Sequence, residues 1–116
     1  MSYHKQFSSI FDGLRVAYGT YKIDKKQLNG KTTGKAGVVR EERTPELWDG
    51  HLSGKGRSVG IIPINEENNC KWGCVDIDEY NFDHKALIQK IRTLKLPLVV
   101  CRSKSGGAHV FIFTSE

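Results

Sequence analysis

Two acids placed two residues apart in an otherwise apolar segment constrain this chain more than any other feature. Asp76 and Asp78 lie in the sequence CVDID, and residues 70–78 have the composition of a β-strand. Side chains at positions i and i+2 of a strand share one face, about 7 Å apart. Two such carboxylates repel each other, and a shared cation would remove that conflict. The pattern predicts a divalent-cation site, with a solvated strand end as the alternative.

The residues after the two acids predict a compact β-α-β-β unit. Residues 83–95 have apolar side chains at helical spacing, and Asp83 is a suitable N-cap. Residues 97–102 and 109–114 have the composition of strands. A right-handed crossover from strand 72–78 to strand 97–102 leaves room for strand 109–114 between them. This order is the first half of a ferredoxin-like β-α-β-β-α-β unit.

This topology makes a specific geometric prediction about three polar residues. The first and third strands of the unit become antiparallel neighbours, so the end of one lies beside the start of the other. We therefore expect Asp76 and Asp78 to lie next to His109, which can donate to a phosphate or act near a metal. A lone histidine on a strand is more often structural. Val75 and Ile77 should point to the opposite face, onto the 83–95 helix.

A basic turn joins the last two expected strands and is a candidate phosphate site. It contains Arg102, Ser103, Lys104, Ser105, Gly106 and Gly107. Two cations, two hydroxyls and two glycines can hold phosphate oxygens through side chains and backbone N–H groups. The chain has no G-x-x-x-x-G-K-[ST] sequence, so this is not a Walker A loop. An ordinary polar hairpin turn is the alternative.

The positive charge of the chain lies in its first half. The net charge is +5, and residues 1–60 have 11 Lys/Arg against 6 Asp/Glu, whereas residues 61–116 have 7 of each. Residues 24–37 are expected to be a cationic loop that contacts a nucleic-acid template, with disorder as the alternative. The candidate nucleic-acid-binding residues are Lys25, Lys26, Lys31, Lys35 and Arg40. Ordinary solubilising charge explains the composition equally well.

The expected fold class is α+β. We predict a partial ferredoxin- or RRM-like β-α-β-β unit in a mostly antiparallel sheet, with an N-terminal α/β extension. Residues 1–56 form the basic extension and residues 57–116 the catalytic half, within one compact domain overall. Earlier elements are expected at residues 5–14 (helix), 15–23 (strand), 38–43 (short strand), 45–52 (helix capped by Thr44) and 57–64 (strand). The strand at 57–64 should form an antiparallel hairpin with the strand at 70–78.

The three cysteines and the apolar pattern indicate an intracellular protein. Cys70, Cys74 and Cys101 are odd in number and lack zinc-finger spacing, so we expect buried free thiols, not disulfides or a zinc site. No apolar run approaches the ~20 residues that span a bilayer, and the N-terminus does not resemble a signal peptide. We expect no membrane partner.

VDID, followed about 30 residues later by SKSGGAHVFIF, resembles the archaeo-eukaryotic primase superfamily. The first motif of that superfamily is two acids flanking one residue, and its second is a small residue, any residue and His. In this sequence Asp76-Ile77-Asp78 resembles the first motif, and Gly107-Ala108-His109 resembles the second. Residues 10–116 resemble most closely the primase-polymerases of bacteria, phages and mobile elements, including the primase domains of TOTE conflict systems.

The resemblance implies template-directed nucleotidyl transfer by a DNA primase or polymerase. Asp76 and Asp78 would bind Mg²⁺ or Mn²⁺ in a two-metal mechanism. His109 would contact the phosphates of the incoming nucleotide, and the 102–107 turn would line the triphosphate path. The implied partners are nucleoside triphosphates, single-stranded or primed DNA, and a helicase or other replication protein. The implied location is the cytoplasm, for a bacterial, phage or plasmid-encoded protein.

One departure from the family pattern bears on activity. The family has a third motif, a further acid on a later strand, whereas this sequence stops at Glu116 directly after the second-motif strand. Glu79 should face away from Asp78 and is a poor substitute. We therefore expect an N-terminal fragment or a naturally shortened relative. The competing hypotheses are a non-catalytic nucleotide- or nucleic-acid-binding remnant and, third, a nicking nuclease, which would need a histidine pair and a nucleophilic tyrosine.

Overall fold

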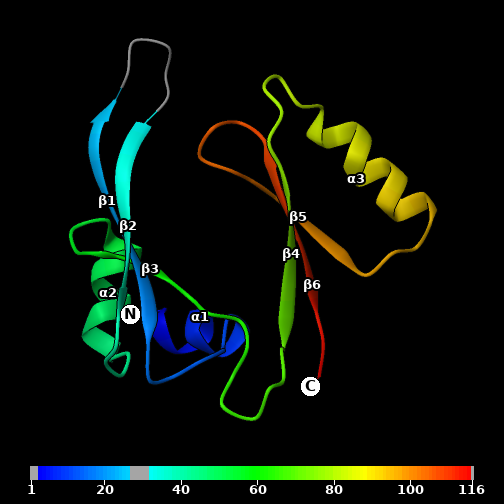
Figure 1. Ribbon diagram of the computed structural model, residues 1–116. Coiled ribbons are helices and arrows are strands. Elements are labelled where there is room, and N and C mark those ends of the chain that lie inside the picture. The colour runs from blue at the N-terminus through cyan, green and yellow to red at the C-terminus, as the bar shows by residue number, and fades with distance from the viewer. Residues whose placement is uncertain (1–2, 27–31, 116) are drawn as a thin grey trace. The chain divides into compact units, whose positions relative to one another are not determined.

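The computed structural model describes residues 3–26 and 32–115, which form two compact units (Figure 1). The chain passes from the first unit to the second between Lys71 and Trp72. Each unit contains a three-stranded antiparallel sheet, with two helices in the first and one in the second among the described residues, which confirms the α+β class. The functional division at residue 56 stays a prediction. In the described part of the chain, no helix has the length and apolarity that crossing a bilayer demands.

The first unit combines two helices with a long β-hairpin and a short third strand. Its elements are α1 (His4–Ile10), β1 (Tyr18–Lys26), β2 (Thr32–Val39), α2 (Pro45–Ser53) and β3 (Ser58–Gly60), with strand order β2-β1-β3. Tyr18 and Trp48 are buried in its core. The ring of Phe7 on α1 packs edge-on against Trp48 at 5.5 Å, so aromatic contacts join the two helices.

Helix α2 begins and ends where its sequence specifies. The Thr44 hydroxyl accepts a hydrogen bond from the backbone N–H of Leu47 at 3.2 Å, and Pro45 occupies the first turn. Gly54 follows the helix with φ of 72°, a left-handed conformation that glycine adopts without steric cost. The predicted helix and its Thr44 cap are therefore confirmed.

The Asp12 carboxylate is the main polar anchor of the first unit. It accepts a hydrogen bond from the backbone N–H of Gly13 at 2.9 Å and pairs with Arg43 at 3.2 Å and Lys71 at 3.4 Å. The Arg43 side chain is only 7% exposed. Burial by itself would raise the pKa of Asp12, but the Gly13 hydrogen bond and the Arg43 and Lys71 cations together lower it.

The second unit has the β-α-β-β order that the sequence predicts. Its elements are β4 (Trp72–Ile77), α3 (His84–Thr93), β5 (Leu98–Arg102) and β6 (Ala108–Phe113). The strand order is β4-β6-β5, so the last strand lies between the other two, as the crossover argument predicts. The Asp83 carboxylate caps α3 by accepting from the N–H of Ala86 at 3.0 Å.

Three predictions about strands and packing are wrong. Most of the expected 24–37 loop is strand, because β1 continues to Lys26 and β2 begins at Thr32. The strand expected at residues 57–64 is only three residues long, Ser58–Gly60. It pairs with β1 and therefore forms no hairpin with β4. Val75 on the edge strand β4 is 65% exposed and not covered by α3, because α3 packs against β5, the strand at the opposite edge of the sheet.

We predict that Asp12→Asn destabilises the chain by about 2 kcal/mol at neutral pH. The amide leaves the nearly buried Arg43 guanidinium without its counter-charge. Because the folded-state pKa of Asp12 is lowered, its stabilisation is present above the ordinary value of 3.8 and is lost as the pH falls through the folded pKa. Urea unfolding should therefore show that the difference in unfolding free energy between Asp12→Asn and wild type narrows as the pH falls through the folded-state pKa of Asp12.

The exposed Glu41, changed to Gln, is the matched control for this measurement and should leave the unfolding free energy nearly unchanged. A pH-independent gap between Asp12→Asn and wild type would contradict the role of the Asp12 charge.

Candidate metal and nucleotide site

The register of the second sheet places Asp76 directly opposite His109. The two residues are cross-strand partners on β4 and β6. The Oδ1 atom of Asp76 lies 3.4 Å from Nε2 of His109, and the two side chains are 68% and 44% exposed. Directly opposed residues of antiparallel strands share one face of the sheet. The neighbourhood of Asp76 and His109 that the sequence predicts is therefore confirmed, on a solvent-accessible face.

Asp78 lies one residue beyond the end of β4 and is exposed. The last paired row of this sheet is Ile77, Ala108 and Arg102, so β4 and β5 end and β6 begins at the same end of the sheet. Both acids and the 103–107 turn therefore lie at that end. A shared face for Asp76 and Asp78 stays a prediction, because strand alternation does not extend past Ile77.

The turn between β5 and β6 is closed by its own backbone. The N–H of Ser103 donates to the carbonyl of Gly107 at 3.0 Å, and the N–H of Gly106 donates to the carbonyl of Ser103 at 3.1 Å. Gly106 has φ of 94°, which disfavours any residue with a side chain. The Ser103 and Ser105 hydroxyl oxygens are 3.5 Å apart. The turn thus presents two neighbouring hydroxyls of the kind that bind phosphate oxygens.

Gly107 fixes this turn against the strand that carries Asp76. A side chain at Gly107 would collide with the backbone carbonyl of Ile77, so only glycine permits this close approach. His84, the first residue of α3, adds a hydrogen bond from Nε2 to the Gly107 carbonyl at 2.8 Å. The turn, the end of β4 and the start of α3 are therefore held together at one point.

Sequence reasoning missed the role of His84. The signal was its position directly after the Asp83 N-cap, because the start of α3 and the turn lie at the same end of the sheet. The ring of Phe82 meets that of His84 edge-on at 5.1 Å and restricts its orientation. We interpret His84 as a residue that positions the turn.

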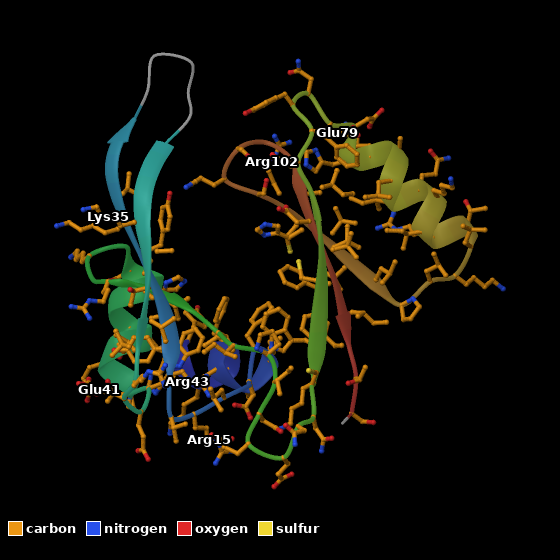
Figure 2. All side chains as sticks on the ribbon, in the orientation of Figure 1. Arg15, Lys35, Glu41, Arg43, Glu79 and Arg102 are labelled. Carbon is orange, nitrogen blue, oxygen red and sulfur yellow. The ribbon has the colours of Figure 1, made fainter. Side chains whose placement is uncertain are left out.

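Two basic residues of the turn have different relations to the site. Arg102 pairs with Ala108, so its side chain emerges from the opposite sheet face to His109. The sheet therefore does not bring Arg102 together with Asp76 and His109. Figure 2 shows Arg102 near the end of the sheet where the labelled Glu79 follows β4. Lys104 is exposed in the turn itself.

Two thiols lie on the same face as the acid and the histidine. Cys101 on β5 pairs with His109, and Cys74 precedes Asp76 by two residues on β4. All three cysteines are exposed, so the expectation of buried thiols is wrong. Cys74 and Cys101 are exposed because α3 covers the opposite face of the sheet. Burial, followed by the negative charge of Asp76, raises the pKa of Cys74. A hard divalent cation prefers the oxygen atoms of Asp76 and Asp78 to such a thiol.

The site as described holds two carboxylates and one imidazole. Among residues 3–26 and 32–115, no group of three or more His, Cys, Asp or Glu side chains is arranged to hold a metal ion. Two aspartates are enough for a cation such as Mg²⁺ that keeps several water ligands and binds substrate phosphates. The donor chemistry therefore fits a hard divalent cation bound together with a polyphosphate.

The predicted nucleic-acid-binding residues belong to the first unit. Lys35 lies on β2 opposite Lys22, and Arg40 directly follows β2. Lys31 lies outside the described residues, and so do the side chains of Lys25 and Lys26. A nucleic-acid-binding role for these residues stays a prediction.

A comparison with protein-family models matches residues 9–116 to the archaeo-eukaryotic primase domain of the TOTE conflict system. The match covers nearly the whole chain, including both acids, the turn and His109. It confirms the superfamily resemblance that the two motifs indicate. No match was found among curated proteins or among solved structures.

We predict that Gly107→Ala destabilises the second unit and displaces the turn. The added methyl group meets backbone, which has less freedom to move than a side chain, so the cost should be about 2 kcal/mol or more. Thermal unfolding and a crystal structure of the variant would measure both effects.

Gly73→Ala is the control for this substitution. A methyl group at Gly73 on β4 would lie 3.5 Å from the Ile112 side chain, an ordinary contact, so little change is expected. Equal stability of the Gly107→Ala and Gly73→Ala variants would contradict the close approach described above.

Proposed function

The chain belongs to the archaeo-eukaryotic primase domain family of TOTE conflict systems, and from this premise we propose that it acts in template-directed DNA synthesis. Membership in a primase domain family supports a nucleotidyltransferase-like function in general. The specific proposal is a DNA primase or polymerase that joins a nucleotide to a primer 3′-oxygen and releases pyrophosphate. Its substrates would be nucleoside triphosphates and single-stranded or primed DNA.

The observation that carries this proposal is the pairing of Asp76 with His109. It puts an exposed carboxylate and an imidazole on one sheet face, 3.4 Å apart, beside the 103–107 turn. A metal–triphosphate complex needs these partners side by side: oxygen donors for the cation and hydrogen-bond donors for the phosphates. The sheet register supplies both without a conformational change.

Asp76 and Asp78 are the residues that would hold Mg²⁺ or Mn²⁺. Primase-like nucleotidyltransferases typically use divalent metals, and exposed carboxylates are the ligands that such cations prefer. When bound, the metal would provide Lewis-acid stabilisation of the negative charge that develops on the phosphoryl group and the leaving pyrophosphate. The two aspartates also keep this end of β4 from attracting a triphosphate unless a cation is present.

The other residues of the site bind and orient the nucleotide. His109 donates a hydrogen bond to a phosphate oxygen, and the carboxylate of Asp76 restricts the orientation of its imidazole. The hydroxyls of Ser103 and Ser105 bind further phosphate oxygens, with Gly106 and Gly107 allowing close approach. Lys104 adds positive charge at the mouth of the turn, and Arg102 contributes at longer range from the opposite face.

A second candidate function rests on the number of metal ligands. No group of three suitable ligands occurs among the residues that the structure describes. Two carboxylates can bind a metal–nucleotide complex without giving efficient turnover. The alternative is therefore a non-catalytic nucleotide- or nucleic-acid-binding protein of the same fold.

The same proposal includes a cellular setting. A protein that uses nucleoside triphosphates and DNA would work in the cytoplasm, and we propose a bacterium, a phage or a plasmid as its source. A helicase or another replication protein is the expected partner, because template-directed synthesis requires single-stranded DNA.

We predict that primer extension with Mn²⁺ or Mg²⁺ depends on both aspartates. Asp76→Asn/Asp78→Asn removes the oxygen charge that binds the cation, so extension should fall by at least about a hundredfold. The exposed acids of the first unit provide the matched control, Glu41→Gln/Glu42→Gln, which loses the same charge and should retain activity.

The assay separates the two candidate functions. Extension that survives the double aspartate substitution would contradict the metal assignment. A wild-type chain that binds triphosphate with Mn²⁺ but never extends a primer would support the non-catalytic alternative.

We predict that His109→Gln weakens triphosphate binding without weakening the binding of metal alone. Loss of a hydrogen bond to a charged phosphate should reduce affinity roughly tenfold. Calorimetry would measure triphosphate binding, and electron paramagnetic resonance would measure free Mn²⁺. Cys101→Ser, the cross-strand neighbour on β5, is the control. A parallel loss of Mn²⁺ binding in His109→Gln would show that this residue is instead a metal ligand.

A further inference from the structure

Two lysines face each other across the long hairpin of the first unit. Lys22 on β1 and Lys35 on β2 are direct cross-strand partners, so their side chains leave the same face of the sheet. Both are exposed, and Figure 2 shows Lys35 extending from β2. Like charges directly opposite each other destabilise a strand pair. Nothing in strand pairing itself favours lysine at both positions.

A third cation from another element joins this pair. Lys22, Lys35 and Arg57 line one pocket of about 770 Å³ between the hairpin and the loop that follows α2. Thr20, which lies on the same sheet face as Lys22, adds a hydroxyl group to its wall. Gly37, Gly54 and Gly56 contribute no side chains, so the space between the cations stays open. This pocket lies in the first unit and shares no residue with the Asp76–His109 site.

The charge of this pocket is not balanced within the described chain. None of the residues that line it is an aspartate or glutamate. Among the described residues, none of the three cations forms an ion pair. The Asp12 anchor in the same unit is the contrast, because there Arg43 and Lys71 are paired with a carboxylate. The described residues thus leave three positive charges and the Thr20 hydroxyl around a solvent-filled space.

We propose that this pocket binds phosphodiester groups of a single-stranded nucleic acid. Lysine and arginine with hydroxyl donors are the usual partners of backbone phosphates, and three cations repel a metal cation. Cations on two strands and a loop suit successive phosphates of one strand. The choice of nucleic acid as the source of phosphate rests on the proposed function; the anion site itself rests on the pocket alone.

The test is the salt dependence of DNA binding by the 116-residue chain. Fluorescence anisotropy of a labelled single-stranded oligonucleotide, in EDTA and between about 50 and 200 mM salt, gives the slope of log K against log salt concentration. Lys22→Ala/Lys35→Ala should reduce that slope by about 1.4 and the affinity roughly tenfold, since each lost phosphate contact removes about 0.7.

Arg57→Gln tests the same pocket from a different element. It should reduce the slope of log K against log salt concentration by about 0.7, and it alters no residue of the β1–β2 hairpin. Lys85→Ala/Lys90→Ala, two exposed lysines of α3, removes the same charge as the hairpin variant and should leave the slope unchanged. Circular dichroism of each variant checks that the fold is kept.

Several outcomes would overturn the proposal: a wild-type slope in the hairpin variant, an equal loss in the α3 control, or no DNA binding by the wild type. Calorimetry with pyrophosphate tests whether the pocket is instead a site for a small anion. If Lys22→Ala/Lys35→Ala loses pyrophosphate binding but keeps its DNA binding, the proposal of a nucleic-acid site is also overturned. Because EDTA removes the metal, Asp76→Asn/Asp78→Asn should bind DNA normally here. Failure of the metal site and failure of this pocket therefore give different results.

Discussion

The antiparallel pairing of β4 with β6 is the constraint on which the candidate site depends. A shift of one residue in this register would move His109 to the opposite face from Asp76. The register is held at the end of the strands, where Gly107 lies against the Ile77 carbonyl and His84 bonds to Gly107. The residues that hold the register are therefore not those that would touch a nucleotide, although they decide where such residues lie.

Much of the second unit could be predicted from the sequence because its signals are local or topological. Asp83 caps its helix, and a right-handed β-α-β crossover leaves room for β6 between β4 and β5. The position of Asp76 beside His109 follows from that strand order. His84 was missed because its partner is a backbone carbonyl 23 residues away, which leaves no pattern in side-chain chemistry.

The first unit was harder to predict, and the errors have physical reasons. Lysines and glycines in residues 24–37 are poor strand formers, yet the pairing of β1 with β2 makes strand of residues 24–26 and 32–37. Intrinsic preference was overridden by long-range pairing. The partner of Ser58–Gly60 was misassigned because a short connection to β4 suggests a hairpin, whereas the strand pairs with residues 19–21. Val75 is exposed because α3 packs against β5 and not over β4, whereas Cys74 and Cys101 lie on the face that α3 does not cover.

Three groups of charges stand out in the described chain, one built on ion pairs and two unbalanced. In the ion-paired group, the Asp12 carboxylate pairs with Arg43 and Lys71, and these ion pairs stabilise the first unit. Asp76 and Asp78 are two exposed anions at one strand end, and Lys22, Lys35 and Arg57 are three cations around one pocket. Repulsion within each unbalanced group costs stability, so each is better explained by a ligand than by folding. A divalent cation suits the first and a phosphate backbone the second, and nucleotidyl transfer onto DNA requires both.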